Sequence, residues 1–355
     1  MRYSSTKTAQ DTRLSKSLRR ENSLTNKVSS TDIISVLTHA GGNFVSGEYL
    51  SQCLGISRTA VWKRITALKK EGYNIEASTK KGYRLNITEA PYGKTSIEQG
   101  LNTHTFGRDI KFYQEIDSTN NCLKRLASEG AQEGTVVVAN CQTAGRGRLG
   151  RNWQSAPEKG IWMSVLLRPQ LHPSEVQVLT LAASAAVCKA LEPLNIKGLG
   201  IKWPNDILVG GKKVCGILTE MSAEAERVSW VVVGIGINVN HLPRDFPAEL
   251  SDTATSLRIE SKNDSLINRS IVASNIINSL EEIYLKYLDQ GAEVVIREWK
   301  KYNLTLGNKI RLSSYDGESI PGTAYDILPD GRLSVRKDDG TIINVLSGEV
   351  SLRQI

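Results

Sequence analysis

The chain has 355 residues, of which 40% are hydrophobic and 23% charged, so it is long enough for more than one globular domain. It has no apolar run near the ~20 residues of a membrane-spanning helix, and its polar N-terminus lacks the apolar core of a secretory signal. Five scattered cysteines and four distant histidines predict neither a disulfide framework nor a metal site. We therefore expect a cytoplasmic protein that does not bind membranes.

The net charge of +8 is concentrated at one end of the chain. Residues 1–85 hold 15 Lys and Arg against 6 Asp and Glu, a net charge of +9, whereas the other 270 residues have a net charge of −1. This distribution predicts a polyanionic partner for the N-terminal part alone. Residues 1–30 contain few large apolar side chains, so we expect them to form a disordered basic tail.

Residues 31–88 have the pattern of a winged helix-turn-helix domain. After a first helix, two further helices are predicted, joined by a tight turn at Gly55, with Ser46 as the N-cap of the earlier one. The later helix has apolar residues at i, i+4 and i+7, which predicts one buried face. Strands over 74–78 and 83–85 then form the expected wing.

The second helix of such a motif enters the major groove of DNA by its N-terminal residues. Polar and basic side chains occupy the positions where the helix and the wing are expected to contact DNA: Ser57, Arg58, Thr59, Lys63, Lys80 and Lys81. A helical pair that mediates protein contacts is the alternative. The positive charge, the turn glycine and the wing together favour DNA binding.

After a linker that contains Pro91 and Gly93, residues 95–303 predict an α/β domain. The polar cluster Asp117–Asn121 is expected to cap its first helix. Strands are predicted over 110–116, 136–140, 161–167, 207–209, 212–220 and 229–240, and helices over 122–129, 174–191, 270–287 and 292–302.

A loop rich in glycine and arginine, residues 142–160, lies between two of these strands. Glycine lets the backbone approach a ligand closely, and the arginine fork suits carboxylates and phosphates. The loop is expected to wrap an anionic small molecule, and a solvated surface loop is the alternative. Its G-x-G-x-x-G spacing does not indicate dinucleotide binding, because a strand follows the glycines and the acidic residue expected ~20 positions on is absent.

Two lysines and two glycines stand out in the later strands of this domain. Lys202 and Lys213 have apolar neighbours, and a lysine in such a place is costly to bury unless it meets an anion. Gly234 and Gly236 permit close approach of another group to their strand. From residue 304 to 355, short alternating strands separated by Asp-Gly turns predict a small β-barrel.

Together these motifs resemble those of the biotin–protein ligase family. The matching segments are DSTN at 117–120, GRGRLGR at 145–151, KWPND at 202–206, GKKVCGIL at 211–218, GIGINVN at 234–240 and GEVSLR at 348–353. The resemblance covers residues 31–355, and the winged helix makes the chain similar to the bifunctional form that also represses biotin synthesis genes. It implies an α+β multidomain fold: a winged helix-turn-helix, a mixed-sheet α/β catalytic domain of the biotin/lipoate ligase type (similar to class II synthetases) and an SH3-like barrel.

The resemblance implies a two-step reaction with ATP, Mg²⁺ and biotin. Biotin attacks the α-phosphate of Mg-ATP to give biotinyl-5′-AMP, and a lysine of a biotin carboxyl carrier protein of acetyl-CoA carboxylase then attacks the mixed anhydride. It also implies operator DNA as a partner, with biotinyl-5′-AMP as corepressor. We further expect homodimerisation on adenylate binding, with no metal held by the protein itself.

The same resemblance assigns site residues by their place in these motifs. Arg146, Arg148 and Lys213 match positions at the acyl-phosphate centre. Biotin or its adenylate would further contact Ser118, Thr119, Asn120, Gln142, Gly145 and Gly147. The nucleotide side would include Arg151, Trp153, Lys202, Asn205, Asp206 and Asn238.

Three alternatives stand beside this interpretation. A lipoate–protein ligase has a similar fold and chemistry, but the GRGRxGR and KWPND pair favours biotin. A biotin-sensing regulator without ligase activity is disfavoured by the presence of Arg146, Arg148 and Lys213. A ligase whose winged helix does not bind DNA is disfavoured by the positive charge of residues 1–85.

Overall fold

The computed structural model describes residues 30–70, 73–85, 91–224, 226–262, 265–313, 319–346 and 349–352. They form two compact units, one that ends at Ser96 and one that begins at Ile97. The predicted tail up to residue 29, residues 86–90 of the linker and the predicted turn at Asp316 lie outside the described residues. The domain limits expected from the sequence stay predictions.

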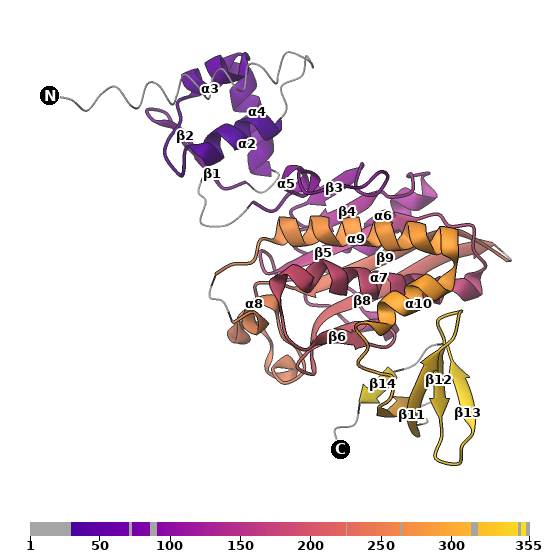
Figure 1. The fold of residues 1–355 in the computed structure, drawn as a ribbon. Coiled ribbons are helices and arrows are strands. Elements are labelled where there is room, and N and C mark those ends of the chain that lie inside the picture. Colours follow the sequence, from indigo (N-terminus) through magenta and orange to yellow (C-terminus); the bar gives the residue numbers. More distant parts are fainter. Residues whose placement is uncertain are drawn as a thin grey trace. The chain divides into compact units, whose positions relative to one another are not determined.

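The smaller unit has three helices followed by an antiparallel hairpin (Figure 1). Its elements are α2 (Ser30–His39), α3 (Gly47–Leu54), α4 (Arg58–Lys70), β1 (Ile75–Ser78) and β2 (Gly82–Leu85). Ser46 accepts a hydrogen bond from the backbone N–H of Tyr49, and Gly55 ends α3 with a φ of 64°. Ser57 accepts one from the N–H of Ala60 at 3.2 Å. These three end signals of the helix-turn-helix are confirmed.

The core of the smaller unit is made by the apolar faces that the sequence predicts. Leu50 and Leu54 of α3 are buried together with Val61, Ile65 and Leu68 of α4. Burial of these faces leaves the opposite side of α4 exposed to solvent, because an apolar stripe at i, i+4 and i+7 covers only one side of a helix.

The larger unit is built on a mixed seven-stranded sheet in the order β3-β4-β5-β9-β8-β7-β6. Only β3 and β4 pair in parallel; every other neighbouring pair in this sheet is antiparallel. The strands are β3 (Ile110–Tyr113), β4 (Val136–Ala139), β5 (Gly160–Leu167), β6 (Leu199–Lys202), β7 (Asp206–Val209), β8 (Lys212–Glu224) and β9 (Arg227–Asn238).

The α-helices described between residues 94 and 300 are α5 (Lys94–Glu98), α6 (Thr119–Ser128), α7 (Val176–Leu191), α8 (Leu257–Glu260), α9 (Arg269–Gln290) and α10 (Ala292–Lys300). Figure 1 shows α7, α9 and α10 as a layer over the sheet. By length and composition the segment Pro173–Leu194, which contains α7, could cross a membrane, but 78% of its apolar window is buried inside the protein. That burial is typical of the core helix of a globular domain.

Successive residues of β8 and β9 point to opposite faces of the sheet, and the two faces differ. One face packs against α7, where the hydroxyls of Thr180 and Thr219 lie 2.8 Å apart. The other face carries α6 and the arginine-glycine loop. On this second face Gly234 leaves the room that Asn120 occupies, because a Cβ there would lie 2.1 Å from the Asn120 Oδ1.

Several predicted element ends were wrong. The strand predicted over 110–116 ends at Tyr113, since its neighbour β4 ends at Ala139 and Ile116 forms only an isolated bridge to Gln142. The helix predicted from 122 begins at Thr119, with Ser118 as its N-cap. The return strand β8 runs on to Glu224, because it pairs with β9 along almost its whole length.

The C-terminal part forms a five-stranded antiparallel sheet in the order β13-β12-β11-β10-β14. Its strands are β10 (Lys309–Ser313), β11 (Ser319–Ile327), β12 (Leu333–Arg336), β13 (Ile342–Val345) and β14 (Glu349–Leu352). The short strands and the Asp-Gly turns at 330 and 339 were predicted, but β14 was not. Among the described residues β13 and β14 are the edge strands of this small barrel-type sheet.

The C-terminal sheet is attached to the larger sheet through the KWPND segment. The backbone N–H of Trp203 donates to the hydroxyl of Thr305 at 2.8 Å, and its indole N–H donates to the carbonyl of Gly331 at 3.1 Å. Trp203 is fully buried. A motif that lines the larger sheet is therefore held partly by the C-terminal sheet.

Candidate active site

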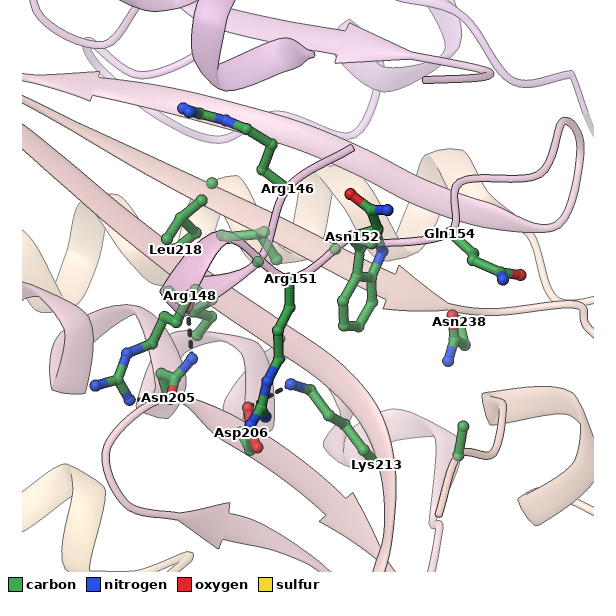
Figure 2. Close-up of a pocket in the computed structure, with 18 of the residues that line it drawn as sticks. Arg146, Arg148, Arg151, Asn152, Gln154, Asn205, Asp206, Lys213, Leu218 and Asn238 are labelled. Atoms are coloured by element: carbon green, nitrogen blue, oxygen red, sulfur yellow. Dashed lines mark hydrogen bonds and ion pairs between the residues drawn. The ribbon is translucent and has the colours of Figure 1, made fainter. Parts of the chain in front are cut away.

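A cavity of about 1010 Å³ opens on the face of the larger sheet that carries α6 and the loop (Figure 2). Fourteen of the fifteen site residues expected in this unit line it; Gly145 does not. A Cβ on Gly145 would lie 2.4 Å from the carbonyl oxygen of Trp153, so this glycine lets the loop fold back on itself. The fold therefore brings together, in one cavity, residues that the resemblance had selected from five segments of the sequence.

One end of the cavity is a polar network at the start of α6. The backbone N–H and the hydroxyl of Thr119 lie 2.8 and 3.1 Å from the Gln142 Oε1. The Gln142 amide donates to the Ser155 Oγ at 2.8 Å, and Ser164 lies under the pair with its Oγ 2.8 Å from the Thr119 Oγ1. Ser118 caps α6 and lines the same end. This arrangement can recognise a compact polar ring by short hydrogen bonds.

Asn120 also lines this end, but protein groups already bond its amide on both sides. Its Nδ2 donates to the carbonyl of Leu218 at 3.2 Å and to the Glu220 Oε2 at 2.8 Å. Its Oδ1 accepts from the Ser164 Oγ at 2.6 Å. Asn120 therefore stabilises the polar end of the cavity through its hydrogen bonds to other protein groups.

The middle of the cavity contains cations that are held by protein acceptors. The Lys213 Nζ lies 2.6 Å from the Asp206 Oδ1, and the Lys202 Nζ lies 3.5 Å from the Asp206 Oδ2. The Arg148 Nη1 donates to the Asn205 Oδ1 at 2.9 Å. The anion that the sequence required for these two lysines is thus Asp206. Together these groups can neutralise a phosphate that enters between them.

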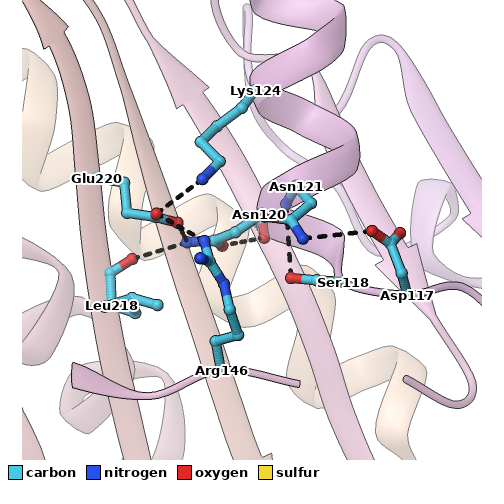
Figure 3. A network of polar contacts seen from close by, with 9 residues as sticks. Asp117, Ser118, Asn120, Asn121, Lys124, Arg146, Leu218 and Glu220 are labelled. Atoms are coloured by element: carbon cyan, nitrogen blue, oxygen red, sulfur yellow. Dashed lines mark hydrogen bonds and ion pairs between the residues drawn. The ribbon is translucent and has the colours of Figure 1, made fainter. Parts of the chain in front are cut away.

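The structure separates Arg146 from Arg148 and Lys213, although the resemblance places all three at one centre. Figure 2 shows the side chain of Arg146 pointing away from the other two. Its Nη2 lies 2.7 Å from the Glu220 Oε1 instead, and Glu220 also pairs with Lys124 (Figure 3). In this structure the guanidinium of Arg146 binds beside the polar end of the cavity.

Trp153 lies flat against the sheet where two strands carry glycine. A Cβ on Gly216 or Gly236 would lie 2.9 or 2.7 Å from the indole ring. The ammonium of Lys213 lies 5.2 Å from the ring centre, in cation–π range. The indole N–H is buried and finds no acceptor among the described groups.

Sequence reasoning missed several residues beyond Asn238 at the far end of the cavity. His241 and Phe246 line it, and their rings stack with centres 5.1 Å apart. Burial lowers the pKa of His241 to about 4, so its imidazole is neutral. This segment has no regular periodicity, and only the motif next to it pointed there. Asn308 and Val350 of the C-terminal sheet also reach the cavity.

The expected DNA-contacting residues form a second candidate surface on the smaller unit. Arg58, Thr59 and Lys63 are exposed on α4, on the side away from its buried face. Lys80 and Lys81 are exposed at the β1–β2 turn. Ser57 is an N-cap as well as a surface residue. A basic helix and a basic hairpin tip are thus both presented to solvent.

Family models match three consecutive parts of the chain. The model of the biotin/lipoate A/B protein ligase family matches residues 112–238. An HTH domain model matches residues 30–84, and the biotin protein ligase C terminal domain matches residues 305–353.

Individual relatives match over most of the chain. A Bacillus subtilis protein named bifunctional ligase/repressor BirA is 41% identical over 321 residues, which is 90% of this chain and 98% of that relative. The Escherichia coli protein of the same name is 29% identical over 88% of this chain and 94% of its own length. The structure of the Aquifex aeolicus biotin protein ligase in complex with biotin and ATP is similar, with a TM-score of 0.59 and 32% identity over 70% of this chain and all of that one.

Proposed function

The chain belongs to the biotin/lipoate A/B protein ligase family, and we propose that it is a biotin–protein ligase that also represses the genes of biotin synthesis. It forms biotinyl-5′-AMP from biotin and ATP and transfers biotin to a lysine of a carrier protein. The observation that carries the ligase proposal is the single cavity that joins a polar end at Ser118 and Thr119 to the cations Arg148 and Lys213.

In the first step a biotin carboxylate oxygen attacks the α-phosphorus of ATP, and the bond to pyrophosphate breaks. Two anions must meet in this step, and the attacking and leaving oxygens share extra negative charge in the transition state. Arg148 and Lys213 neutralise that charge. Thr119 and Gln142 fix the ureido ring at the polar end, so that the carboxylate points along the cavity.

In the second step the amine of the carrier lysine attacks the carbonyl carbon of the anhydride, and AMP leaves. The anhydride is already activated, so the protein needs no serine or cysteine nucleophile. The loop over the cavity keeps water from the anhydride in the meantime. Trp153 and Asn238 bind the nucleotide side, with Arg151, Lys202, Asn205 and Asp206 around the phosphates.

Magnesium enters this site on ATP. The described residues contain no cluster of three or more His, Cys, Asp or Glu that would hold a metal by itself. Asp206 is the carboxylate at the centre of the cavity, and Mg²⁺ is commonly held by one or two carboxylates together with substrate phosphates. We propose that Asp206, which Lys202 and Lys213 hold in this structure, is the carboxylate nearest to the Mg²⁺ that ATP brings.

The ligase proposal is tested with labelled biotin, Mg-ATP and a biotin carboxyl carrier domain. We expect label on the carrier lysine only when ATP is present. A parallel reaction with lipoate separates the alternative ligase, because preferential transfer of lipoate would contradict our assignment. Adenylate formation without transfer would identify a sensing regulator instead.

For repression, α4 and the β1–β2 turn contact operator DNA, and biotinyl-5′-AMP is the corepressor. We propose that adenylate binding promotes homodimerisation, which places two winged helices on a palindromic operator. Sedimentation velocity with and without biotinyl-5′-AMP tests the dimer. We expect a larger sedimentation coefficient with the adenylate, and an unchanged coefficient at concentrations that repress transcription would contradict the proposal.

A further inference from the structure

Glu220 lies on β8, on the same face of the sheet as the cavity, and its carboxylate joins three segments (Figure 3). The Oε1 lies 2.8 Å from the Lys124 Nζ of α6 and 2.7 Å from the Arg146 Nη2 of the loop. The Oε2 accepts from the Asn120 Nδ2 at 2.8 Å. Neither the sequence motifs nor the proposed mechanism uses Glu220.

The loop has few other side-chain anchors near its first arginine. Its backbone joins the segment before α6 through the N–H of Thr143 and of Ala144, which donate to the carbonyls of Ile116 and Asp117 at 2.9 and 2.8 Å. Beyond these bonds the loop folds back on itself: the N–H of Trp153 donates to the carbonyl of Gly145 at 2.9 Å, and the N–H of Gly147 donates to the carbonyl of Arg151 at 2.7 Å. Both bonds lie within the loop and do not attach it to the sheet. The Arg146–Glu220 ion pair is therefore well placed to fix the loop at the point where it leaves α6 and crosses the cavity.

We propose that Glu220 is a positioning residue for the ligase reaction, which fastens the arginine-glycine loop over the cavity by holding Arg146. This inference rests on the proposed function. The second oxygen of Glu220 holds Asn120, which follows Ser118 and Thr119 at the polar end. One carboxylate thus connects the biotin end of the cavity to the loop that covers it.

The role requires a charged carboxylate. Burial by itself would raise the pKa of Glu220, but hydrogen bonds from Lys124 and Asn120 and the charges of Lys124 and Arg146 outweigh that effect and lower it. Glu220 is therefore ionised at neutral pH. A glutamine of nearly the same shape still accepts a hydrogen bond from Arg146 but loses the attraction between two opposite charges, so it holds Arg146 less firmly.

The test is Glu220→Gln in the full chain, with two measurements. Trypsin cuts after arginine, so the rate of cleavage at Arg146, Arg148 and Arg151 in the ligand-free protein, identified by mass spectrometry, reports the opening of the loop. The release rate of labelled biotinyl-5′-AMP reports its closure over ligand. We expect both rates to rise about fivefold, as for loss of one partly exposed ion pair, with an unchanged thermal midpoint.

Two variants serve as matched controls. Glu282→Gln removes a carboxylate that likewise pairs with two basic side chains, here Lys189 and Lys286, but on α9 and away from the cavity. Lys124→Met removes the charged partner of Glu220 that does not belong to the loop. Both controls should keep wild-type cleavage and release rates, and Glu220→Asp should recover part of the effect because it keeps the charge.

Wild-type rates in Glu220→Gln would overturn the proposal, and so would the same rise in Lys124→Met, which would assign the effect to α6. If Glu220→Gln does not fold, Arg146→Gln breaks the same ion pair from the loop; it removes the cleavage site at residue 146, and it must raise cleavage at Arg148 and Arg151. A wild-type protein that forms no biotinyl-5′-AMP would contradict the proposed function alone, since the cleavage rate in the ligand-free protein still tests the fastening.

Discussion

His241 is buried between the rings of Trp162 and Phe246 and carries no charge at neutral pH. Removal from water lowers its pKa from 6.5 to about 4; Asp245 opposes this shift and Lys159 adds to it. A depressed histidine pKa means that the unfolded chain binds the proton more readily. Stability from this residue is complete above about pH 6.5 and is lost as the pH falls toward about 4.

We therefore expect His241→Gln to flatten the acid dependence of stability. The free energy of unfolding of the wild-type protein should fall by up to about 3 kcal/mol more than that of the variant between about pH 7 and pH 4. Urea denaturation at several pH values measures this difference. Equal pH slopes in the two proteins would show that His241 is solvated in the native state.

Single residues also show what the sequence could and could not predict about the site. Arginine and lysine at fixed spacing between glycines carry their chemistry wherever the fold places them, so the motifs pointed to part of the lining of the cavity, without His241, Phe246, Asn308 and Val350. Their pairing did not, because it depends on which strands lie side by side. In the sequence, Glu220 cannot be told apart from other glutamates at the solvent-facing positions of a strand. It has three partners only because α6 and the loop approach it.

At the scale of elements, α4 has a buried apolar face and an exposed face that carries an aromatic side chain as well as charged ones. Trp62 is 57% exposed and lies one turn from both Arg58 and Thr66 on the outer side of the helix. An indole on a helix that enters the major groove can contact thymine methyl groups or the sugar edge. Trp62 thus extends the proposed DNA surface beyond the basic residues.

We expect Trp62→Ala to weaken operator binding about tenfold without a change in ligase activity. Ile271→Ala is the matched control, since Ile271 is similarly exposed at 56% but lies on α9 of the other unit. Fluorescence anisotropy with labelled operator DNA and biotinyl-5′-AMP measures the affinity. Unchanged binding by Trp62→Ala would limit the DNA contact to the charged residues.

The local end signals of α3 were predicted well, whereas the start of α6 was placed three residues late despite its local N-cap Ser118, and strand ends that depend on a partner were missed. Ser46 and Gly55 fix the ends of α3 by side-chain and backbone geometry within a few residues. The ends of β3 and β8 are set instead by where β4 and β9 stop or continue. Such pairing is a property of the sheet and leaves little trace in either strand alone.

At the scale of the whole molecule, the C-terminal sheet is part of the catalytic unit and more than an appended barrel. Gly331 accepts the hydrogen bond from the Trp203 indole and has a φ of 83°, which disfavours any other residue. A Cβ there would also lie 2.9 Å from the Gln177 Cγ of α7. The turn at Asp330 and Gly331 therefore fits against KWPND and α7 only with glycine.

We expect Gly331→Val to separate this turn from Trp203 and to raise the KM for ATP several-fold, because KWPND supplies Asn205 and Asp206. The KM for biotin should change less, since Ser118, Thr119 and Gln142 lie at the other end of the cavity. Steady-state kinetics with each substrate varied in turn checks whether the KM for ATP rises more than the KM for biotin. Gly340→Val is the control, at a turn of the same sheet where an added Cβ meets nothing within 4 Å. Equal changes in both KM values would contradict this expected difference, and a fall in kcat alone would indicate loss of folded enzyme.

A ligand that enters the cavity must displace polar contacts that the protein already makes there. Lys213 is already bound by Asp206, and Arg148 by Asn205. An anion gains only the difference between its own contacts and the ones that it displaces. Inorganic phosphate and other small metabolites, which offer nothing beyond charge, therefore compete poorly. A ligand that also fills the polar end and lies against Trp153 makes further contacts, so we expect it to bind where phosphate alone binds weakly.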